Sequence, residues 1–427
     1  MLLVQCATAF AQDSIRLSLN DVFRIADTAS RKLKLDAINI EAADIQIDIT
    51  KNQQLPDIDA SISGGYLTNV GVIGLGTMKS GFYKMPHLTN SFVLQAGYLL
   101  FSGGRVKEDI EIAKLQHRIA GLNLEKDKLE IKLLLAGYYL DLYRLTLQRN
   151  VYQQNIDQSR VVLEKINNRL RAGIALKSDR IRSELLLEEM KLQLMKLNNS
   201  VLILNNALLE TLSLPVHLVI VPNIEIDSNN NVFVQLQGLT EKALQSEPSL
   251  KISSINISAA QKKLQQVKAN YLPEASLFLN NGLARPYVYD IPAKDIYANN
   301  LNVGVKLNYS IGRLYKNKAR VQLAKMDIDM AREQDELIKE NSRKQVFNAW
   351  VRLKEAKEQL ASENKKVELA TENYRRIANS YGQQLALITD MTDASIQKLD
   401  AELRVATAGI AIMMRYYELQ KVTGQLN

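Results

Sequence analysis

The sequence predicts a mainly α-helical protein with a small β part, in which long coiled-coil-like helical hairpins form two tandem repeats. Three observations lead to this fold class. Short motifs of the first half recur in the second: Leu55-Pro56 as Leu272-Pro273, and Ser178-Asp179 as Thr389-Asp390. Apolar residues keep a heptad spacing over long stretches. Only 8 prolines and 19 glycines interrupt the 427 residues. The distance between copies far exceeds a solenoid repeat, so each copy is a whole architectural unit.

The chain divides into four parts on this pattern. Residues 1–11 look like the remnant of a secretory signal, because Ala9-Phe10-Ala11 has the small-x-small pattern of a cleavage site. The only cysteine, Cys6, fits a lipidation motif poorly, and we expect simple cleavage near Gln12. The remaining parts are the first repeat (residues 12–214), an inter-repeat linker (215–238) and the second repeat (239–427).

Each repeat is expected to contain one very long helix and two shorter ones. Residues 105–171 contain no proline, and their apolar residues step by three and four, which predicts one helix of about 100 Å at about 1.5 Å per residue. The other helices are expected at residues 18–53, 178–213, 239–270, 314–383 and 387–425. In each repeat the two short helices together match the long one in length. We therefore expect the short helices to stack end to end.

Alternating segments between the first short helix and the long helix predict two strands in each repeat. Leu301, Val303, Val305, Leu307 and Tyr309 alternate with Asn302, Gly304, Lys306 and Asn308, giving one apolar and one polar face. Residues 58–62 and 92–100 behave likewise, and residues 275–279 more weakly. Such strands, rimmed by aromatic residues, fit transmembrane β-strands with the five odd-numbered residues facing lipid. Four strands leave unpaired edges in lipid, so several chains must contribute to a barrel.

Composition argues against nucleic-acid binding and catalysis. The net charge is +8, but basic and acidic residues alternate as on a solvated helix face, and no basic cluster with interleaved aromatic residues occurs. His87, His117 and His217 are scattered without metal-ligand spacing. No nucleophile–base constellation accompanies them. We therefore expect no enzyme and no cofactor.

Taken together, these features resemble the TolC family of trimeric outer-membrane efflux ducts, from Leu17 to Leu426. The motifs that carry the resemblance are the duplicated Leu-Pro, the corner Phe101-Ser102-Gly103-Gly104-Arg105, the turn Leu170-Arg171-Ala172-Gly173 before Ser178-Asp179, and Tyr381 with Asp390-Met391-Thr392-Asp393-Ala394. The resemblance implies a homotrimer in the outer membrane of a Gram-negative bacterium. Four strands from each protomer would form a 12-stranded barrel in outer-membrane lipid, continued by an α-helical tunnel across the periplasm.

The resemblance also implies partners and sites. A periplasmic adaptor (a membrane fusion protein) and an inner-membrane pump, either of the resistance-nodulation-division type or ATP-driven, would dock at the tunnel end. Asp390 and Asp393 have the spacing of an aspartate ring at the periplasmic constriction, and residues three apart on a helix share one face. Tyr381 and Asp179 match a tyrosine and an aspartate that tie the two repeats together, whereas Ala386 replaces the arginine of this lock. The tips that would contact the adaptor contain Gly173, Leu176, Ser178, Gln384, Leu387 and Thr389.

Plainer interpretations stay open from the sequence. Ser178-Asp179 and Thr389-Asp390 are also good helix N-cap signatures, although capping does not explain Asp393. Tyr381 is equally a candidate for the helix seam, and Leu176 and Leu387 for packing of the turns. For the whole chain, the alternative to a channel is a secreted coiled-coil structural tether with a small β cap. The channel interpretation covers both small-molecule efflux and type I protein secretion, because the pump partner decides between them.

Overall fold

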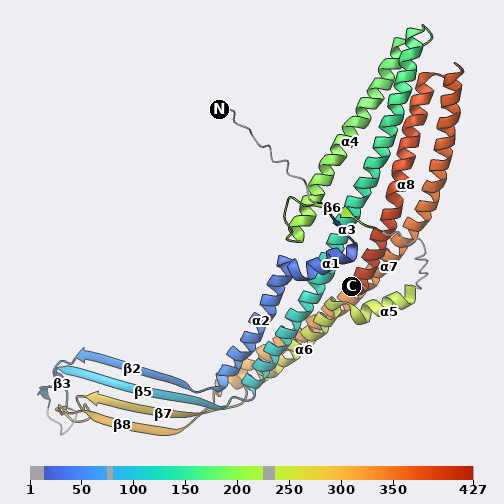
Figure 1. Ribbon diagram of the computed structural model, residues 1–427. Coiled ribbons are helices and arrows are strands. Elements are labelled where there is room, and N and C mark those ends of the chain that lie inside the picture. The colour runs from blue at the N-terminus through green and yellow to red at the C-terminus, as the bar shows by residue number, and fades with distance from the viewer. Residues whose placement is uncertain (1–13, 75–79, 225–235, 427) are drawn as a thin grey trace, which may run out of the picture. The chain divides into compact units, whose positions relative to one another are not determined.

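The computed structural model describes residues 14–74, 80–224 and 236–426. The predicted signal remnant, residues 1–11 with Cys6, and the middle of the predicted linker, residues 225–235, lie outside the described residues. The chain forms two compact units. One comprises Met1–Ile38, Gly121–Lys251 and Glu336–Asn427, and the other comprises Asn39–Ala120 and Ile252–Asp335. Figure 1 shows long helices in both units and a sheet in the second.

The helices follow the same order in the two halves of the sequence. The first half contains α1 (Leu19–Ala29), α2 (Arg31–Lys51), α3 (Arg105–Arg171) and α4 (Lys177–Thr211). The second half contains α5 (Leu236–Ser246), α6 (Pro248–Ala269), α7 (Gly312–Gly382) and α8 (Ile388–Val422). The predicted long helices are confirmed, and α3 has the predicted bounds. No described helix carries an apolar stretch long enough to cross a membrane.

The prediction of one continuous helix at residues 18–53, and of another at 239–270, is wrong. Each is broken in two, at Ser30 and at Glu247. Ser30 leaves the helical conformation with ψ 123°. Glu247 precedes Pro248, and a proline disfavours the helical conformation of the residue before it but is well suited to the first position of the next helix. The second break therefore has a sequence signal, whereas the first has none of comparable strength.

Both breaks lie where a return helix ends. The hydroxyl of Ser213, just after α4, donates to the carbonyl of Ala29 at the end of α1 over 3.3 Å. In the second half, a Cβ on Gly424, just after α8, would lie 3.1 Å from the backbone of Ser246 at the end of α5. Ser213 and Gly424 both have positive φ, 53° and 66°. These contacts agree with the expected end-to-end arrangement of the short helices.

Tyr139 of α3 lies at the centre of the main core of the first unit. Its side chain is fully buried among apolar residues of α1, α3 and α4. Its hydroxyl donates to the carbonyl of Leu17 (2.7 Å) and accepts from the N–H of Asn223 (2.9 Å). Burial raises the pKa of Tyr139 to about 12, so this hydroxyl keeps its proton at physiological pH. Tyr139 thus joins two distant segments of the chain to α3.

Those two segments form a short parallel sheet that the sequence analysis missed. β1 (Ser14–Leu17) pairs with β6 (Val219–Pro222). Asn205 of α4 fixes β6, because its amide donates to the carbonyl of Leu218 over 2.9 Å and accepts from the N–H of Ile220 over 2.8 Å. Strands of four residues carry too short an alternation to be recognised, and their pairing is a long-range event.

The second unit contains a four-stranded antiparallel sheet in the order β2-β5-β7-β8. The strands are β2 (Asp57–Tyr66), β5 (Leu88–Phe101), β7 (Glu274–Arg285) and β8 (Ala298–Asn308). This confirms the two strands predicted in each half, although β8 ends one residue before Tyr309. The connection between β2 and β5 contains a further small hairpin that was not predicted, β3 (Val70–Val72) paired with β4 (Gly81–Tyr83).

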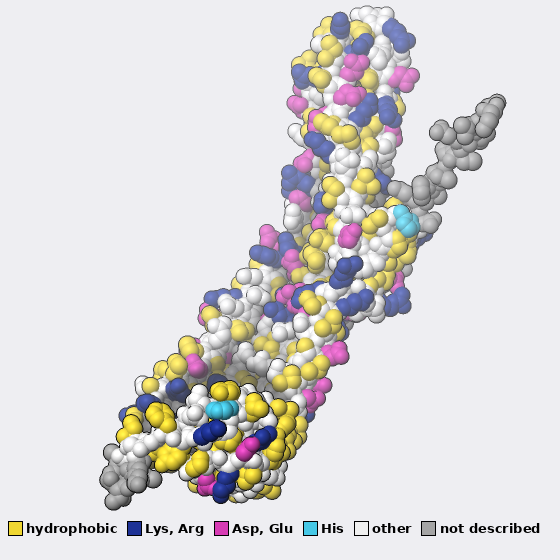
Figure 2. Space-filling view, turned by 90° about the vertical axis from the view of Figure 1, so that its left-hand side faces the viewer, with side chains coloured by type: hydrophobic (Ala, Val, Ile, Leu, Met, Phe, Trp, Pro, Cys, Tyr) yellow, Lys and Arg dark blue, Asp and Glu magenta, His cyan; other side chains and the backbone are white. Residues whose placement is uncertain are grey.

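The register of this sheet gives it two chemically different faces. One row across the strands consists of Ile58, Ala96, Leu279 and Val303, and the next row consists of Asp59, Gln95, Asn280 and Asn302. Consecutive strand residues point to opposite faces, so the apolar row and the polar row lie on opposite sides. Figure 2 shows many hydrophobic side chains at the surface of the unit that contains the sheet, beside a few charged ones, and charges of both signs scattered over the helical surface.

Candidate functional site

The predicted gate residues lie at the tips of two helical hairpins in the first unit. The first tip joins α3 to α4, and the second joins α7 to α8. Both turns close in the same way: the N–H of Ile174 donates to the carbonyl of Arg169, and the N–H of Leu385 donates to the carbonyl of Ser380. A bond of this span, next to a residue of positive φ, is typical of a Schellman motif at a helix end.

Gly173 and Gln384 occupy the equivalent position in the two turns. Their φ angles are 75° and 67°. Glycine adopts this conformation without steric cost, whereas a side-chain-bearing residue loses roughly 1–2 kcal/mol there. The second tip therefore keeps the same backbone path as the first but accommodates a strained glutamine.

Asp179 and Asp390 have the same local role, as the third residue of α4 and of α8. The carboxylate of Asp179 accepts from the N–H of Leu176 (3.3 Å), and that of Asp390 accepts from the N–H of Leu387 (3.1 Å). Leu176 and Leu387 are the N-cap residues, in extended conformation. The reading of Ser178-Asp179 and Thr389-Asp390 as N-cap residues is therefore corrected. The aspartates reach back to the cap from inside the first turn, where a negative charge also favours the helix N-terminus.

Asp393 has no such structural role. It is exposed, as is Asp390, whereas Ile388, Met391 and Ala394 of the same helix are buried. The first turns of α8 thus direct two carboxylates away from the packed side of the helix. Within the described part of the chain, Asp393 forms no ion pair or hydrogen bond through its side chain. Asp393 is therefore available for a role other than stabilising the fold of the protomer.

Arg169 is a residue of this site that the sequence analysis missed. It lies in the last turn of α3, and its guanidinium donates to the carbonyls of Tyr381 (3.2 Å) and Gly382 (2.7 Å) at the end of α7. It also lies over the ring of Tyr381, 5.4 Å from the ring centroid. Burial raises the pKa of Tyr381, the charge of Asp179 raises it further, and Arg169 opposes the shift. Tyr381 is therefore in contact with Arg169 and feels the charge of Asp179, whereas a role of Tyr381 and Asp179 in a gate stays a prediction.

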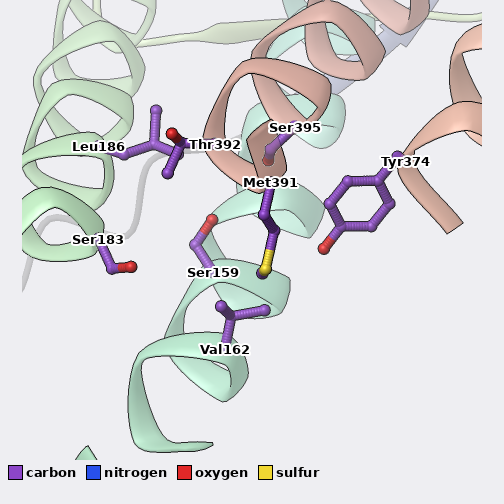
Figure 3. A pocket seen from close by; sticks show the side chains of 8 residues that line it. All are labelled: Ser159, Val162, Ser183, Leu186, Tyr374, Met391, Thr392 and Ser395. Atoms are coloured by element: carbon purple, nitrogen blue, oxygen red, sulfur yellow. The ribbon is translucent and has the colours of Figure 1, made fainter. Parts of the chain in front are cut away.

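A small cavity lies between the four helices near these tips (Figure 3). It is lined by Ser159 and Val162 of α3, Ser183 and Leu186 of α4, Tyr374 of α7, and Met391, Thr392 and Ser395 of α8. Its volume of about 20 Å³ suffices for a water molecule but not for a substrate. The cavity is therefore part of the packing between the two hairpins rather than a binding site.

A polar network close to this cavity joins α3 to α8. The amide of Asn155 donates to the carboxylate of Glu402 over 2.8 Å, and Glu402 pairs with Lys398 over 2.8 Å. Lys398 also donates to the amide oxygen of Gln158 over 3.4 Å. Asn155 is buried and Lys398 is mostly so. Charged groups in such positions are stable only when paired, so this network fixes the relative register of the two hairpins.

The predicted lipid-facing residues lie on the apolar face of the sheet. Leu301, Val303, Val305 and Leu307 of β8 are 62–69% exposed. Tyr309 follows the strand end and is also exposed. A contiguous exposed apolar surface of this kind is rare on a monomer in water and marks contact with lipid or with another protein. β2 and β8 are also open edges of the sheet, which a stable protein must cover or pair.

Comparison with known proteins agrees with this architecture. Residues 25–213 match the model of the outer membrane efflux protein family. A search of curated protein sequences finds no significant match. The fold is similar to the open state of the MtrE outer membrane channel of Neisseria gonorrhoeae (19% identity, TM-score 0.75, 96% of this chain and 89% of that chain). It is also similar to the CmeC outer membrane channel of Campylobacter jejuni (17%, 0.76, 96% and 86%) and to the outer membrane protein VceC of Vibrio cholerae (15%, 0.74, 95% and 96%).

The chain thus has the fold of solved outer-membrane channels, with a helical part and a β part. The first repeat is therefore similar in sequence to the outer membrane efflux protein family, and nearly the whole chain shares the fold of these channel structures.

Proposed function

We propose that this protein is the outer-membrane exit duct of a tripartite efflux pump or of a type I secretion system, and that it works as a homotrimer. The observation that carries this proposal is the four-stranded sheet with an exposed apolar face, a polar opposite face and two open edges. Four strands cannot span a membrane alone. Three copies would pair the open edges and close a 12-stranded barrel with the polar row of Asp59, Gln95, Asn280 and Asn302 toward the lumen.

Apolar stripes on the helices support the same assembly. Exposed apolar residues follow heptad spacing on α2 (Leu35, Ile38, Ile45 and Ile49) and on α7 (Leu323, Met326, Met330 and Leu337). Such a stripe is the seam of a coiled coil that lacks its partner helix. Neighbouring protomers of a trimer are the natural partners, because the barrel requires them to lie side by side. A tether with a β cap would leave both stripes and the sheet face in water.

An experiment separates the duct from the tether. The purified protein should migrate as a heat-resistant trimer in detergent, fractionate with the outer membrane, and give discrete conductance steps in a planar lipid bilayer. A tether would give no conductance, and a soluble monomer would contradict the proposal. The pump partner decides whether the cargo is a small molecule or a secreted protein.

The two tips are the proposed docking points for a periplasmic adaptor, which would link the duct to the inner-membrane pump. Ile174, Leu176, Leu385 and Leu387 expose 54–77% of their surface there. Apolar side chains this exposed at a turn contribute little to the fold of the protomer, and they suit contact with an adaptor's helical hairpin. The residues of the two tips are equivalent, so one kind of partner hairpin fits both.

Bulky substitution at Gly173 tests the docking. Gly173→Trp should abolish efflux while the trimer level in the membrane stays unchanged, because a Cβ added at this exposed turn has no other atom of the protomer within 4 Å. Gly173→Gln is the control for backbone strain, since glutamine already occupies the equivalent position with the same φ at Gln384. Cysteine pairs between each tip and a candidate adaptor should crosslink in cells that express the pump. The docking proposal fails if none of them does.

A further inference from the structure

We propose that Arg169 is the latch that holds the gate closed, in place of the arginine that the second repeat lacks at Ala386. This inference rests on the proposed function as a duct and on the predicted constriction at Asp390 and Asp393. It concerns a contact between two hairpins of one protomer, the α3/α4 hairpin and the α7/α8 hairpin. Opening a gate formed by these tips requires the second hairpin to move away from the first.

The chemistry of the contact suits a latch. Both acceptors of Arg169 are main-chain carbonyls in the last turn of α7, where the final carbonyls of a helix lack intrahelical partners. A cation at this end of a helix is also favoured by the helix dipole. The flat guanidinium of Arg169 donates two hydrogen bonds at once. The same guanidinium also lies over the ring of Tyr381. Lysine cannot reproduce this combination.

Next to Arg169, a small apolar cluster joins α3 to α7 and α8. Ile166, one turn before Arg169 on α3, packs with Ile388 and Met391 of α8 and with Tyr381 of α7. Arg169 therefore closes one end of a small cluster that links three helices. Moving α7 and α8 away from α3 would break this cluster and the Arg169 hydrogen bonds together. Because Asp390 and Asp393 lie in the first turns of α8, the same movement would displace the proposed carboxylate ring.

This latch differs from a lock that depends on the Tyr381 hydroxyl and Asp179. The carboxylate of Asp179 is already used to cap α4, and Arg169 binds the ring and the carbonyl of Tyr381 rather than its hydroxyl. Tyr381→Phe keeps both of these contacts and should leave the gate closed. Tyr381→Ala removes the ring and should weaken the latch.

The test is single-channel conductance of the full-length trimer in planar bilayers. Arg169→Ala should shift the closed-to-open equilibrium by on the order of tenfold toward open, as expected for losing hydrogen bonds to a charged group. Arg169→Lys should lie between this variant and the wild type. Arg171→Ala is the matched control: it removes the same side chain from an exposed position two residues further on, and its conductance should equal that of the wild type. Heat resistance and membrane level of the trimers report assembly.

The outcomes separate this inference from the proposed function. A wild-type protein that forms no channel would contradict the duct itself. A wild type that conducts, with Arg169→Ala indistinguishable from it, would overturn the latch alone. A large effect of Tyr381→Phe would also overturn it, since the hydroxyl would then be the latch. If Arg169→Ala fails to assemble, Arg169→Lys and Tyr381→Ala carry the same test, and unchanged gating in both would reject the proposal.

Discussion

Val303→Arg should prevent stable insertion of the barrel, while Asn302→Arg, one residue earlier on the same strand, should be tolerated. Val303 lies in the middle of β8, in the apolar row with Ile58, Ala96 and Leu279. An arginine that faces lipid near the bilayer midplane costs about 2–4 kcal/mol in each protomer. Three protomers multiply this cost. The expected result is loss of heat-resistant trimer, measured by refolding into lipid vesicles and by the amount of protein in the outer membrane.

Asn302→Arg is a matched control because it introduces the same side chain into the same strand. Asn302 belongs to the polar row with Asp59, Gln95 and Asn280, so the new guanidinium would lie in a hydrated lumen that already contains an acidic residue. Equal tolerance of arginine at positions 302 and 303 would contradict the assignment of the two faces, and with it the membrane barrel.

Asp390→Ala/Asp393→Ala should abolish the cation selectivity of the pore and its block by multivalent cations from the periplasmic side. Both carboxylates are exposed near the start of α8, and a trimer would bring six of them to one constriction. The local field at the narrowest point, rather than the net charge of +8, determines which ions pass. Reversal potentials under a salt gradient in planar bilayers measure the selectivity, and titration with a multivalent cation measures the block.

The capping role of Asp390 calls for a second variant. Removing its hydrogen bond to the N–H of Leu387 costs α8 about 0.5–2 kcal/mol, which could loosen the tip without any effect of charge. Asp179→Ala removes the equivalent bond at the start of α4 and should leave selectivity unchanged. Selectivity and block that persist in the Asp390/Asp393 double variant would show that the ring lies elsewhere in the duct.

Sequence alone determined the elements of this protein that follow from patterns among neighbouring residues. Heptad spacing without proline predicted α3 with its observed bounds, because a helix satisfies its own backbone and presents one apolar seam. Alternation predicted the two strands in each half, including the apolar face of β8, because side-chain direction in a strand follows directly from position. The duplication made Gly173 and Gln384 equivalent positions, and both adopt positive φ.

Tertiary structure alone decided the features that depend on pairs of distant segments. The β1–β6 pair and its anchor Tyr139 bring together residues that are far apart in sequence, and neither strand is long enough to show a pattern. The break at Ser30 coincides with the hydrogen bond between Ser213 and Ala29. The residues around Ser30 alone do not reveal this contact. Arg169 is the clearest case. Its acceptors are backbone carbonyls 212 and 213 residues away, and a carbonyl is present at every residue, so no side-chain identity at the partner position reveals the contact.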